Sequence, residues 1–247
     1  MQSSTSSSPL HPPRVEPGWN PGWREHIPEA LRESIRTVSG RLIAGKLLAV
    51  LVLAMAIAEI SLVTRLDVAL TREIHGWTVG WLTALVSGLT ELGDTQVVIW
   101  LTAGALIGLI SVRHWRGAAA LVLAVVTTQA TVMVAKAVMT RPRPADDIAI
   151  ADPSGWSFPS GHSASAVALY VMLGLIATTI WRRKLPPKII FALAGAIVLL
   201  VGLSRVYLGA HYPTDVLAGW LTGGIVVVAS WAACSRLPCP VSRAATA

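Results

Sequence analysis

Charged residues are scarce in this chain of 247 residues: Asp, Glu, Lys and Arg together make up 13% of it, roughly half the share in an average soluble domain. Hydrophobic residues make up 53%, and the mean hydropathy is +0.61. Apolar stretches of about 20 residues recur, which is long enough to cross a hydrocarbon core of roughly 30 Å. The scarcity of charge excludes a soluble protein and predicts a polytopic membrane protein.

Cysteine is also scarce, and the N-terminal region has no apolar segment of the kind found in signal peptides. The two cysteines, Cys234 and Cys239, do not have metal-ligand spacing, and we expect no chemical role for them. The first 40 residues are rich in Ser and Pro. We expect residues 1–40 to form a flexible cytoplasmic tail, residues 41–235 the membrane domain, and residues 236–247 a short cytoplasmic tail.

Six apolar segments predict an all-α fold, a bundle of six transmembrane helices. The first of them contains an acid, Glu59, for which a functional and a structural role are both open. The expected helices are approximately Leu42–Val63, Thr95–Val112, Ala118–Val138, Ser163–Trp181, Lys188–Arg205 and Thr214–Ala233.

The segment Leu66–Leu92, between the first two expected helices, has a different character. Apolar side chains recur there at spacings of three and four, including Leu70, Trp77 and Trp81. This pattern predicts an amphipathic helix that lies in the membrane interface. A seventh crossing is the alternative, but it would take several charged residues, Asp67 among them, into lipid.

The basic residues predict the orientation. With both termini in the cytoplasm, most of the twenty Lys and Arg residues fall on the inner side, as the positive-inside rule requires. The net charge of +7 therefore reflects topology and attraction to anionic lipid, and we expect no binding of nucleic acid. The basic residues left on the outer side are Arg65, Arg72, Lys136, Arg141, Arg143 and Arg205.

Three polar clusters lie at the expected outer ends of helices three to six. Charged groups at such depth are unfavourable unless they are paired or serve a site. The loops after helices three and five can bring the clusters together, so we expect a cationic pocket that binds a multiply charged anion. The clusters are Lys136 with Arg141 and Arg143, then Ser160, Gly161 and His162, then Arg205, His211 and Asp215.

Local features of the second and third clusters suit an anion site. Ser160 or Ser163 can cap the fourth helix, Gly161 allows close approach of the backbone to a ligand, and free N–H groups at a helix start bind anions. Asp215 falls in the first turn of the sixth helix, where a carboxylate is favoured and can reach back to His211.

Structural explanations stay open for these clusters. Lys136 can extend its amine to the interface, and each histidine can be a surface residue beside a helix cap. A zinc site made of His162, His211 and Asp215 is the chemical competitor, but three cations beside a dication would repel it, so we expect no metal. Three acidic residues in the intervening loop can also pair with the arginines: Asp146, Asp147 and Asp152.

In these motifs the chain resembles the type 2 phosphatidic acid phosphatases, which share their site with vanadium haloperoxidases. The motifs of that family are Lys, six residues and Arg-Pro; then Pro-Ser-Gly-His; then Ser-Arg, five residues, His, three residues and Asp. All three match in order and spacing, as Lys136 with Arg143-Pro144, Pro159 to His162, and Ser204-Arg205 with His211 and Asp215. The resemblance covers about residues 42–235 and implies six helices with an outward-facing site.

The resemblance also implies hydrolysis of a phosphoric ester through a phosphohistidine, with no metal and no cofactor. His211 resembles the nucleophile, Asp215 the partner that fixes its tautomer, and His162 the general acid. Because the two histidines need opposite protonation states, we expect a bell-shaped pH profile. The remaining matched residues resemble the cradle for the phosphoryl oxygens: Lys136, Arg143, Ser160, Gly161 and Arg205.

A site at the level of the lipid headgroups implies a lipid phosphate as substrate and membrane lipids as partners. The expected substrate is undecaprenyl diphosphate at the outer face of a bacterial inner membrane, with phosphatidylglycerophosphate or phosphatidate as the alternative, because the motifs read the phosphate and not the tail. A lipid-linked phosphotransferase, a haloperoxidase and a non-catalytic lipid transporter represent other classes. The oligomeric state is left open.

Overall fold

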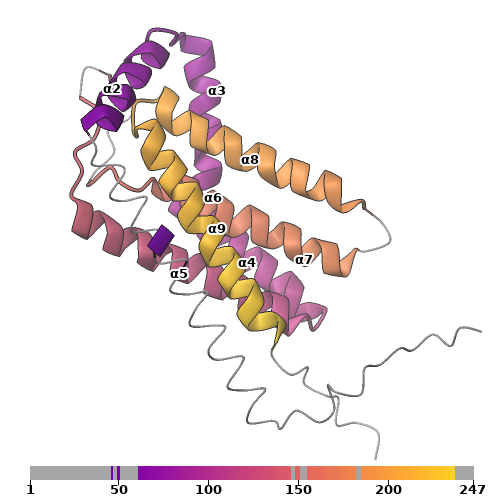
Figure 1. The fold of residues 1–247 in the computed structure, drawn as a ribbon. Helices are drawn as coiled ribbons and strands as arrows, with labels where there is room; N and C mark the ends of the chain where they lie inside the picture. Colours follow the sequence, from indigo (N-terminus) through magenta and orange to yellow (C-terminus); the bar gives the residue numbers. More distant parts are fainter. Residues whose placement is uncertain are drawn as a thin grey trace, which may run out of the picture. The chain divides into compact units, whose positions relative to one another are not determined.

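A computed structural model describes residues 46, 49–50, 61–145, 148–150, 155–181 and 185–236, and its regular elements there are all helical. The described residues belong to one compact unit of the chain. Its elements are α2 (Ser61–His75), α3 (Gly80–Thr90), η2 (Glu91–Gly93), α4 (Thr95–Ser111), α5 (Trp115–Met139), α6 (Gly161–Ala166), η3 (Val167–Val171), α7 (Met172–Ile180), α8 (Pro187–Tyr207) and α9 (Pro213–Ser235), drawn in Figure 1.

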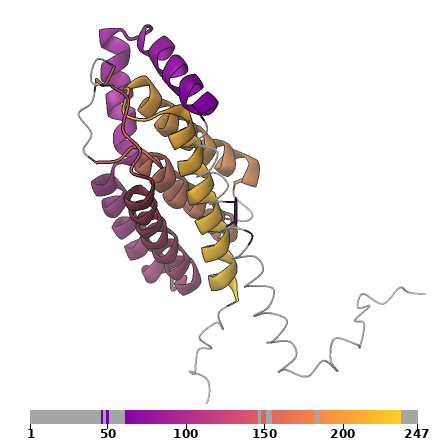
Figure 2. The ribbon, with the colours of Figure 1, turned by 60° about the vertical axis from the view of Figure 1, so that its left-hand side comes forward.

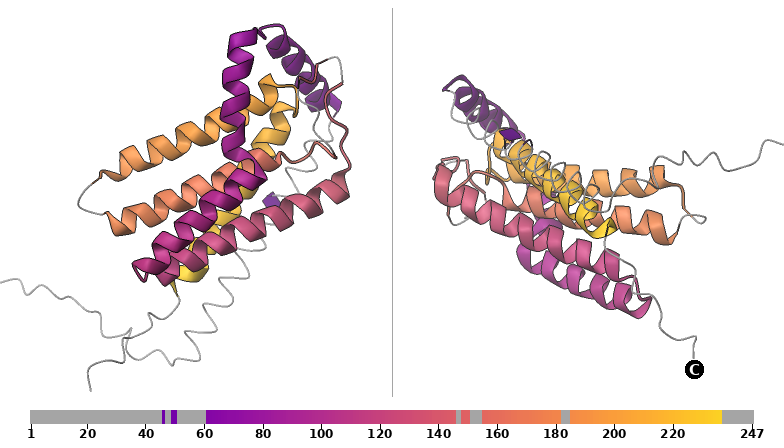
Figure 3. Two further views of the ribbon diagram at one scale, coloured as in Figure 1. Left: turned by 180° about the vertical axis from the view of Figure 1, so that it is seen from behind. Right: turned by 60° about the horizontal axis from the view of Figure 1, so that its bottom comes forward.

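Within the described residues, four helices are long and apolar enough to span a membrane: α5, the continuous helix Gly161–Ile180, α8 and α9. They confirm the predicted third to sixth helices to within a few residues. The second predicted helix is present as α4, which reaches spanning length only together with Gly80–Gly93, at a bend of 51° (Figure 3). Most of the first predicted helix, with Glu59, lies outside the described residues, so the count of six stays a prediction.

The single amphipathic helix predicted over Leu66–Leu92 is wrong in one respect, because the segment forms two helices. α2 ends at His75, and α3 begins only at Gly80, after an extended Val79 (φ −135°, ψ 143°). Two glycines flanking a β-branched pair explain the break, since both residue types disfavour helix. The second helix also continues into η2 and α4 as part of a bent pair. The interfacial position of this segment stays a prediction.

The core of the unit is formed where α9 packs against α5 and α6, with α8 and η3 beside them (Figure 2). Small residues allow this close packing, as is typical of membrane helices. A Cβ atom on Gly219 would lie 2.6 Å from the Ser160 carbonyl oxygen, and one on Gly223 would lie 2.6 Å from that of Ala164. These two glycines let the start of α6 rest directly on α9.

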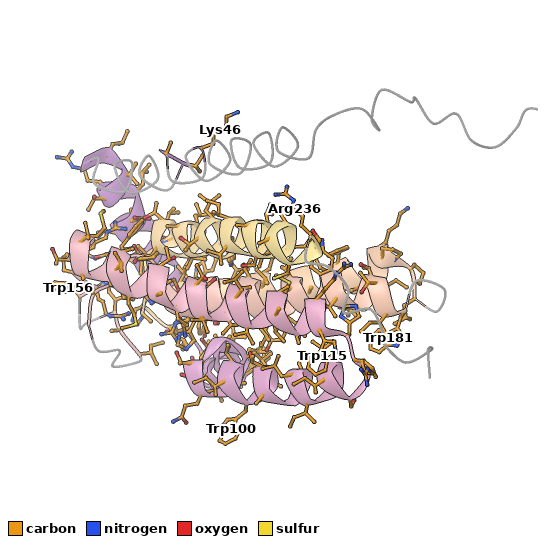
Figure 4. The ribbon with its side chains drawn as sticks, turned by 90° about the horizontal axis from the view of Figure 1, so that it is seen from below. Lys46, Trp100, Trp115, Trp156, Trp181 and Arg236 are labelled. Carbon is orange, nitrogen blue, oxygen red and sulfur yellow. The ribbon has the colours of Figure 1, made fainter. Side chains whose placement is uncertain are left out.

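The four spanning helices alternate in direction, so one end of the bundle collects the end of α5, the start of α6, the end of α8 and the start of α9. Figure 4 shows Trp156 beside this end of α5, whereas Trp115 and Trp181 lie near the other end. All three rings are exposed. Tryptophan at both ends of a spanning bundle is typical of the two membrane interfaces. The three polar clusters therefore meet at one end of the bundle.

Candidate active site

The turn between α8 and α9 presents His211. The backbone N–H groups of Ala210 and His211 both donate to the carbonyl oxygen of Arg205, at 3.0 and 3.2 Å, which closes the turn. Gly209 within it has φ +66°, and a Cβ there would lie 2.4 Å from the carbonyl oxygen of Ile148. A glycine is therefore required at this position, both for its left-handed backbone and for the close approach of the neighbouring loop.

Asp215 lies in the first turn of α9, as predicted, and is fully buried. Its Oδ2 accepts from the backbone N–H of Tyr212 at 3.0 Å and from the Ser157 hydroxyl at 2.5 Å. The same oxygen lies 3.5 Å from Nδ1 of His211, and the Ser157 hydroxyl lies 3.3 Å from that nitrogen. The carboxylate thus faces the imidazole both directly and through Ser157.

The contacts of the His211 ring fix its tautomer. Arg143 Nη1 lies 3.3 Å from Nε2, and because a guanidinium can only donate, Nε2 accepts and carries the lone pair. The proton then sits on Nδ1, where it faces the Ser157 oxygen. Burial lowers the pKa of His211 to about 4, against the opposing hydrogen bond and charge of Asp215. The ring is therefore neutral at pH 7, with the lone pair of Nε2 toward Arg143.

Arg143 and Lys136 hold the loop that carries Ser157. Arg143 donates from Nε to the Gly155 carbonyl oxygen at 2.9 Å and from Nη1 to the Ala210 carbonyl oxygen at 2.6 Å. Lys136 donates from Nζ to the carbonyl oxygens of Trp156 and, at 3.5 Å, Ser157. Burial lowers the pKa of Arg143, and the charge of Asp215 opposes this effect. Both cations lie within electrostatic reach of each other and of Arg205.

The Pro-Ser-Gly-His motif forms the start of α6. Ser160 is the N-cap, and its hydroxyl oxygen accepts from the backbone N–H of Ser163 at 3.4 Å and from the Ser163 hydroxyl at 3.0 Å. Its own backbone N–H donates to the Asp215 carbonyl oxygen at 2.9 Å. This bond ties the second cluster to the third. Gly161 begins the helix, where unpaired N–H groups suit an anion.

His162 and Arg205 form the other side of the site. His162 is partly exposed, with Nε2 at 3.9 Å from Oδ2 of Asp94, the N-cap of α4. The charges of Arg205, His211 and Arg143 all act on this ring, so the three predicted clusters do converge. Arg205 is buried and donates from Nη1 to the Thr90 hydroxyl at 3.0 Å, while its Nε has no hydrogen-bond partner among the described residues.

Several residues of this site were not predicted from the sequence. Ser157 lies only three residues before the Pro-Ser-Gly-His serine, and its hydroxyl could have been suspected from that position. Asp67 was interpreted as a charge of an amphipathic segment, and Arg141 was placed in the first cluster without a role of its own, yet both are buried beside Asp215. Thr90 and Asp94 come from the segment around η2, which no motif marks. The acidic residues Asp146, Asp147 and Asp152 lie outside the described residues.

No three His, Cys, Asp or Glu side chains among the described residues group closely enough to hold a metal ion. His162, His211 and Asp215 in particular do not form such a group. Metal independence stays a prediction, which an assay in the presence of a chelator tests.

Comparison with known proteins identifies similar chains. A family model described as the PAP2 superfamily matches residues 117–237, which include every predicted site residue. Phosphatidylglycerophosphatase B of Bacillus subtilis (strain 168) is 33% identical over 148 residues, or 58% of this chain and 70% of that protein. Decaprenylphosphoryl-5-phosphoribose phosphatase of Mycobacterium tuberculosis (strain H37Rv) is 33% identical over 153 residues, or 58% of this chain and 75% of that protein.

Among solved structures, the chain is similar to the crystal structure of a transmembrane PAP2 type phosphatidylglycerolphosphate phosphatase from Bacillus subtilis. The TM-score is 0.72 and the sequence identity 26%, over 78% of this chain and 96% of that one. Together with the spanning helices, this likeness makes the chain an integral membrane protein.

Proposed function

Because the chain belongs to the PAP2 superfamily and is a phosphoric-ester hydrolase, we propose that it removes phosphate from a membrane lipid through a phosphohistidine at His211. The observation that carries the proposal is the fixed neutral imidazole: Nδ1 faces Ser157 and Asp215, and Nε2 is directed at Arg143. Attack on a bound phosphorus requires a neutral ring with its lone pair on Nε2, and the phosphoryl group then takes the guanidinium of Arg143 from that lone pair to its own oxygens.

In the first step, Nε2 of His211 forms a bond to phosphorus, and the bond from phosphorus to the lipid oxygen breaks. Asp215 stabilises the positive charge that develops on the ring, directly and through Ser157. His162 gives its proton to the departing lipid oxygen. In the second step, water attacks the phosphohistidine, His162 takes a proton from it, and His211 returns to its neutral form. Phosphate is released and the atoms balance.

Charge on the equatorial oxygens is stabilised by the fixed cations of the site. Phosphoryl transfer asks mainly for positioning and for such stabilisation. Arg143 already lies at 3.3 Å from the attacking nitrogen, and Arg205 has an unpartnered Nε. Lys136, the Ser160 hydroxyl and the Gly161 N–H complete the cradle. A bound phosphoryl group adds negative charge beside His162 and so favours the protonated ring that a general acid needs.

The substrate is proposed to be a lipid phosphate or diphosphate that is reached from the outer face of a bacterial inner membrane. Both termini of the protein are proposed to lie in the cytoplasm. The exposed Trp156 at the site's end of the bundle supports a position at headgroup level. Two candidates have specific support. The relatives named for phosphatidylglycerophosphate favour that lipid, and the decaprenyl relative favours a polyprenyl substrate such as undecaprenyl diphosphate.

The proposal is tested by phosphate release from the purified protein in detergent with a chelator present. Phosphatidylglycerophosphate, undecaprenyl diphosphate and phosphatidate are compared, with His211→Ala as the blank and His114→Ala, at the opposite end of α5, as the matched control. We expect hydrolysis of at least one lipid. The rate of phosphate release should fall about 10⁴-fold or more in His211→Ala and should not fall in this way in His114→Ala. Transfer of phosphate to another lipid instead of water would identify a phosphotransferase. Activity that persists in His211→Ala contradicts the proposal.

A further inference from the structure

A row of three buried charged side chains connects α2 with the start of α9. Arg141, in the loop after α5, donates from Nη2 to Oδ2 of Asp67 at 2.7 Å and from Nη1 to Oδ1 of Asp215 at 2.6 Å. The exposed fractions are 6% for Arg141, 2% for Asp67 and 0% for Asp215. Figure 1 shows α2 close to the first turns of α9. Pairs this buried are not the weak ion pairs of a protein surface.

Arg141 determines which oxygen of Asp215 faces the imidazole. It takes Oδ1, together with a hydrogen bond from Nη1 to the Thr214 hydroxyl at 2.8 Å, and this leaves Oδ2 for Ser157, Tyr212 and His211. The guanidinium also lies over the Tyr212 ring, 4.5 Å from its centroid, which limits its rotation. Burial alone would lower the pKa of Arg141, but Asp215 and Asp67 outweigh burial and raise it.

Asp67 holds both Arg141 and the first turn of α9. Its Oδ1 accepts from the backbone N–H of Thr214 at 3.1 Å, and its Oδ2 accepts from the Thr214 hydroxyl. The Thr214 N–H is one of the N–H groups of a helix start that has no partner within the helix. A carboxylate from another helix therefore caps α9 at the turn that carries Asp215. Its negative charge is favourable at that end of the helix dipole.

We propose that Asp67 and Arg141 are positioning residues for phosphoryl transfer, acting through Asp215 on the orientation of His211. The proposal rests on the proposed role of His211 as the nucleophile. The side-chain hydrogen bonds of Asp67 and Arg141 join them to each other, to Thr214 and to Asp215, so neither is proposed to touch the substrate. Because their effect is on the reactive geometry of the ring, their loss lowers kcat and leaves KM nearly unchanged.

The test uses the full-length protein and p-nitrophenyl phosphate. Asp67→Asn leaves Arg141 and Asp215 as a pair with no net charge, so it is the mildest change. Arg141→Lys keeps the positive charge but cannot contact Asp67 and Asp215 with two separate nitrogens. We expect kcat to fall about tenfold in each, as for other outer partners of a site, with KM within about twofold. Glu73→Gln, an exposed acid on the same helix, is the control that keeps wild-type rates.

A double-mutant cycle separates positioning from general damage. If Asp67 acts through Asp215, Asp67→Asn adds nothing to the loss in an Asp215→Asn background. Rates are taken per folded protein from size-exclusion chromatography, and if Asp67→Asn does not fold, the same cycle is run with Arg141→Lys. Losses that add fully in the cycle, or a kcat within twofold of wild type, overturn the inference. Activity that survives in His211→Ala instead overturns the proposed function, so the two failures are distinguishable.

Discussion

The two sides of the site differ in how completely their polar atoms are paired. Around His211, both ring nitrogens and both oxygens of Asp215 have partners, and these partners come from the loop between α5 and α6 and from the start of α9. Around His162 the pairing is sparse. The ring is 3.9 Å from Asp94, and the Nε of Arg205 has no partner within the described part of the chain.

Under the proposed roles, this difference means that the nucleophile His211 is organised before the substrate binds, whereas the side of the acid His162 is completed by the substrate. A group that must attack from one direction gains from fixed hydrogen bonds, since no reorganisation is needed during the reaction. A general acid must reach different leaving oxygens and exchange its proton, so a partly exposed ring with few contacts suits that role. An unpaired donor on Arg205 is likewise suited to a phosphoryl oxygen.

After the loss expected in His211→Ala, the largest expected effect comes from the sparsely paired side around His162. His162→Ala removes the proton donor, so first-turnover release of a lipid alcohol should fall about 10³-fold. Release of p-nitrophenol from p-nitrophenyl phosphate should fall by less than about tenfold, because that anion leaves without a proton. Both rates are measured by rapid mixing of purified protein with each substrate.

His114→Ala serves as control for this comparison. His114 is the N-cap of α5 at the other end of the helix, where its Nδ1 accepts from the backbone N–H of Gly117 at 3.2 Å. Its loss affects helix stability and not the leaving group. Equal losses for both substrates in His162→Ala would show that the ring has a role other than proton donation.

The contrast between the two sides was only partly visible in the sequence. The matched motifs gave the spacing of Lys136, His162 and His211, because each motif is a local feature of a helix end. The contact of Arg141 with Asp67 joins residues 74 positions apart, and it depends on where α2 folds back onto α9. No local pattern encodes such a contact, so Arg141 was placed in the first cluster without a partner or a role.

The fold shows the same division between local and distant information. Long apolar runs predicted α5, α8 and α9, and Pro213 at the first position of α9 fits its start. The break at Gly76 to Val79 was missed, because the spacing of apolar residues stays helical across it while the backbone leaves the helical conformation. The extended turn is held by Tyr207 of α8, whose hydroxyl accepts from the Val79 N–H at 3.2 Å.

The buried position of His211 also leads to a prediction about how the stability of the protein depends on pH. The pKa of His211 is about 4 in the folded protein and about 6.5 when unfolded, so below pH 6.5 the unfolded state binds the extra proton more readily. Stability from this group is fully present above pH 6.5 and is lost as pH falls toward 4, by about 3 kcal/mol. Unfolding of the protein in detergent is followed at pH 7.5 and pH 4.5.

Carboxylates elsewhere in the protein titrate in the same pH range, so the quantity to compare is the difference between the wild type and a variant at His211. His211→Gln cannot take up this proton, and its free energy of unfolding should fall less than that of the wild type between the two pH values. The advantage of the wild type over the variant then shrinks on acidification. Equal losses of unfolding free energy in the wild type and the variant would mean that the His211 ring is solvated. The pairing around His211 would then not be more complete than that around His162.

A further effect is expected at Arg205, where charge and geometry are separated. Arg205→Lys keeps a cation but removes Nε, the donor without a partner, and the bond from Nη1 to Thr90. A lysine offers a point charge in place of a planar fork, so kcat/KM should fall about tenfold to a hundredfold, with inhibition by inorganic phosphate weakened in parallel. Arg72→Lys, exposed on α2, is the matched control and should change neither quantity. If Arg205→Lys changes these quantities no more than Arg72→Lys does, the unpaired Nε of Arg205 has no role in binding phosphate. The sparse pairing around His162 then reflects loose packing rather than a site that the substrate completes.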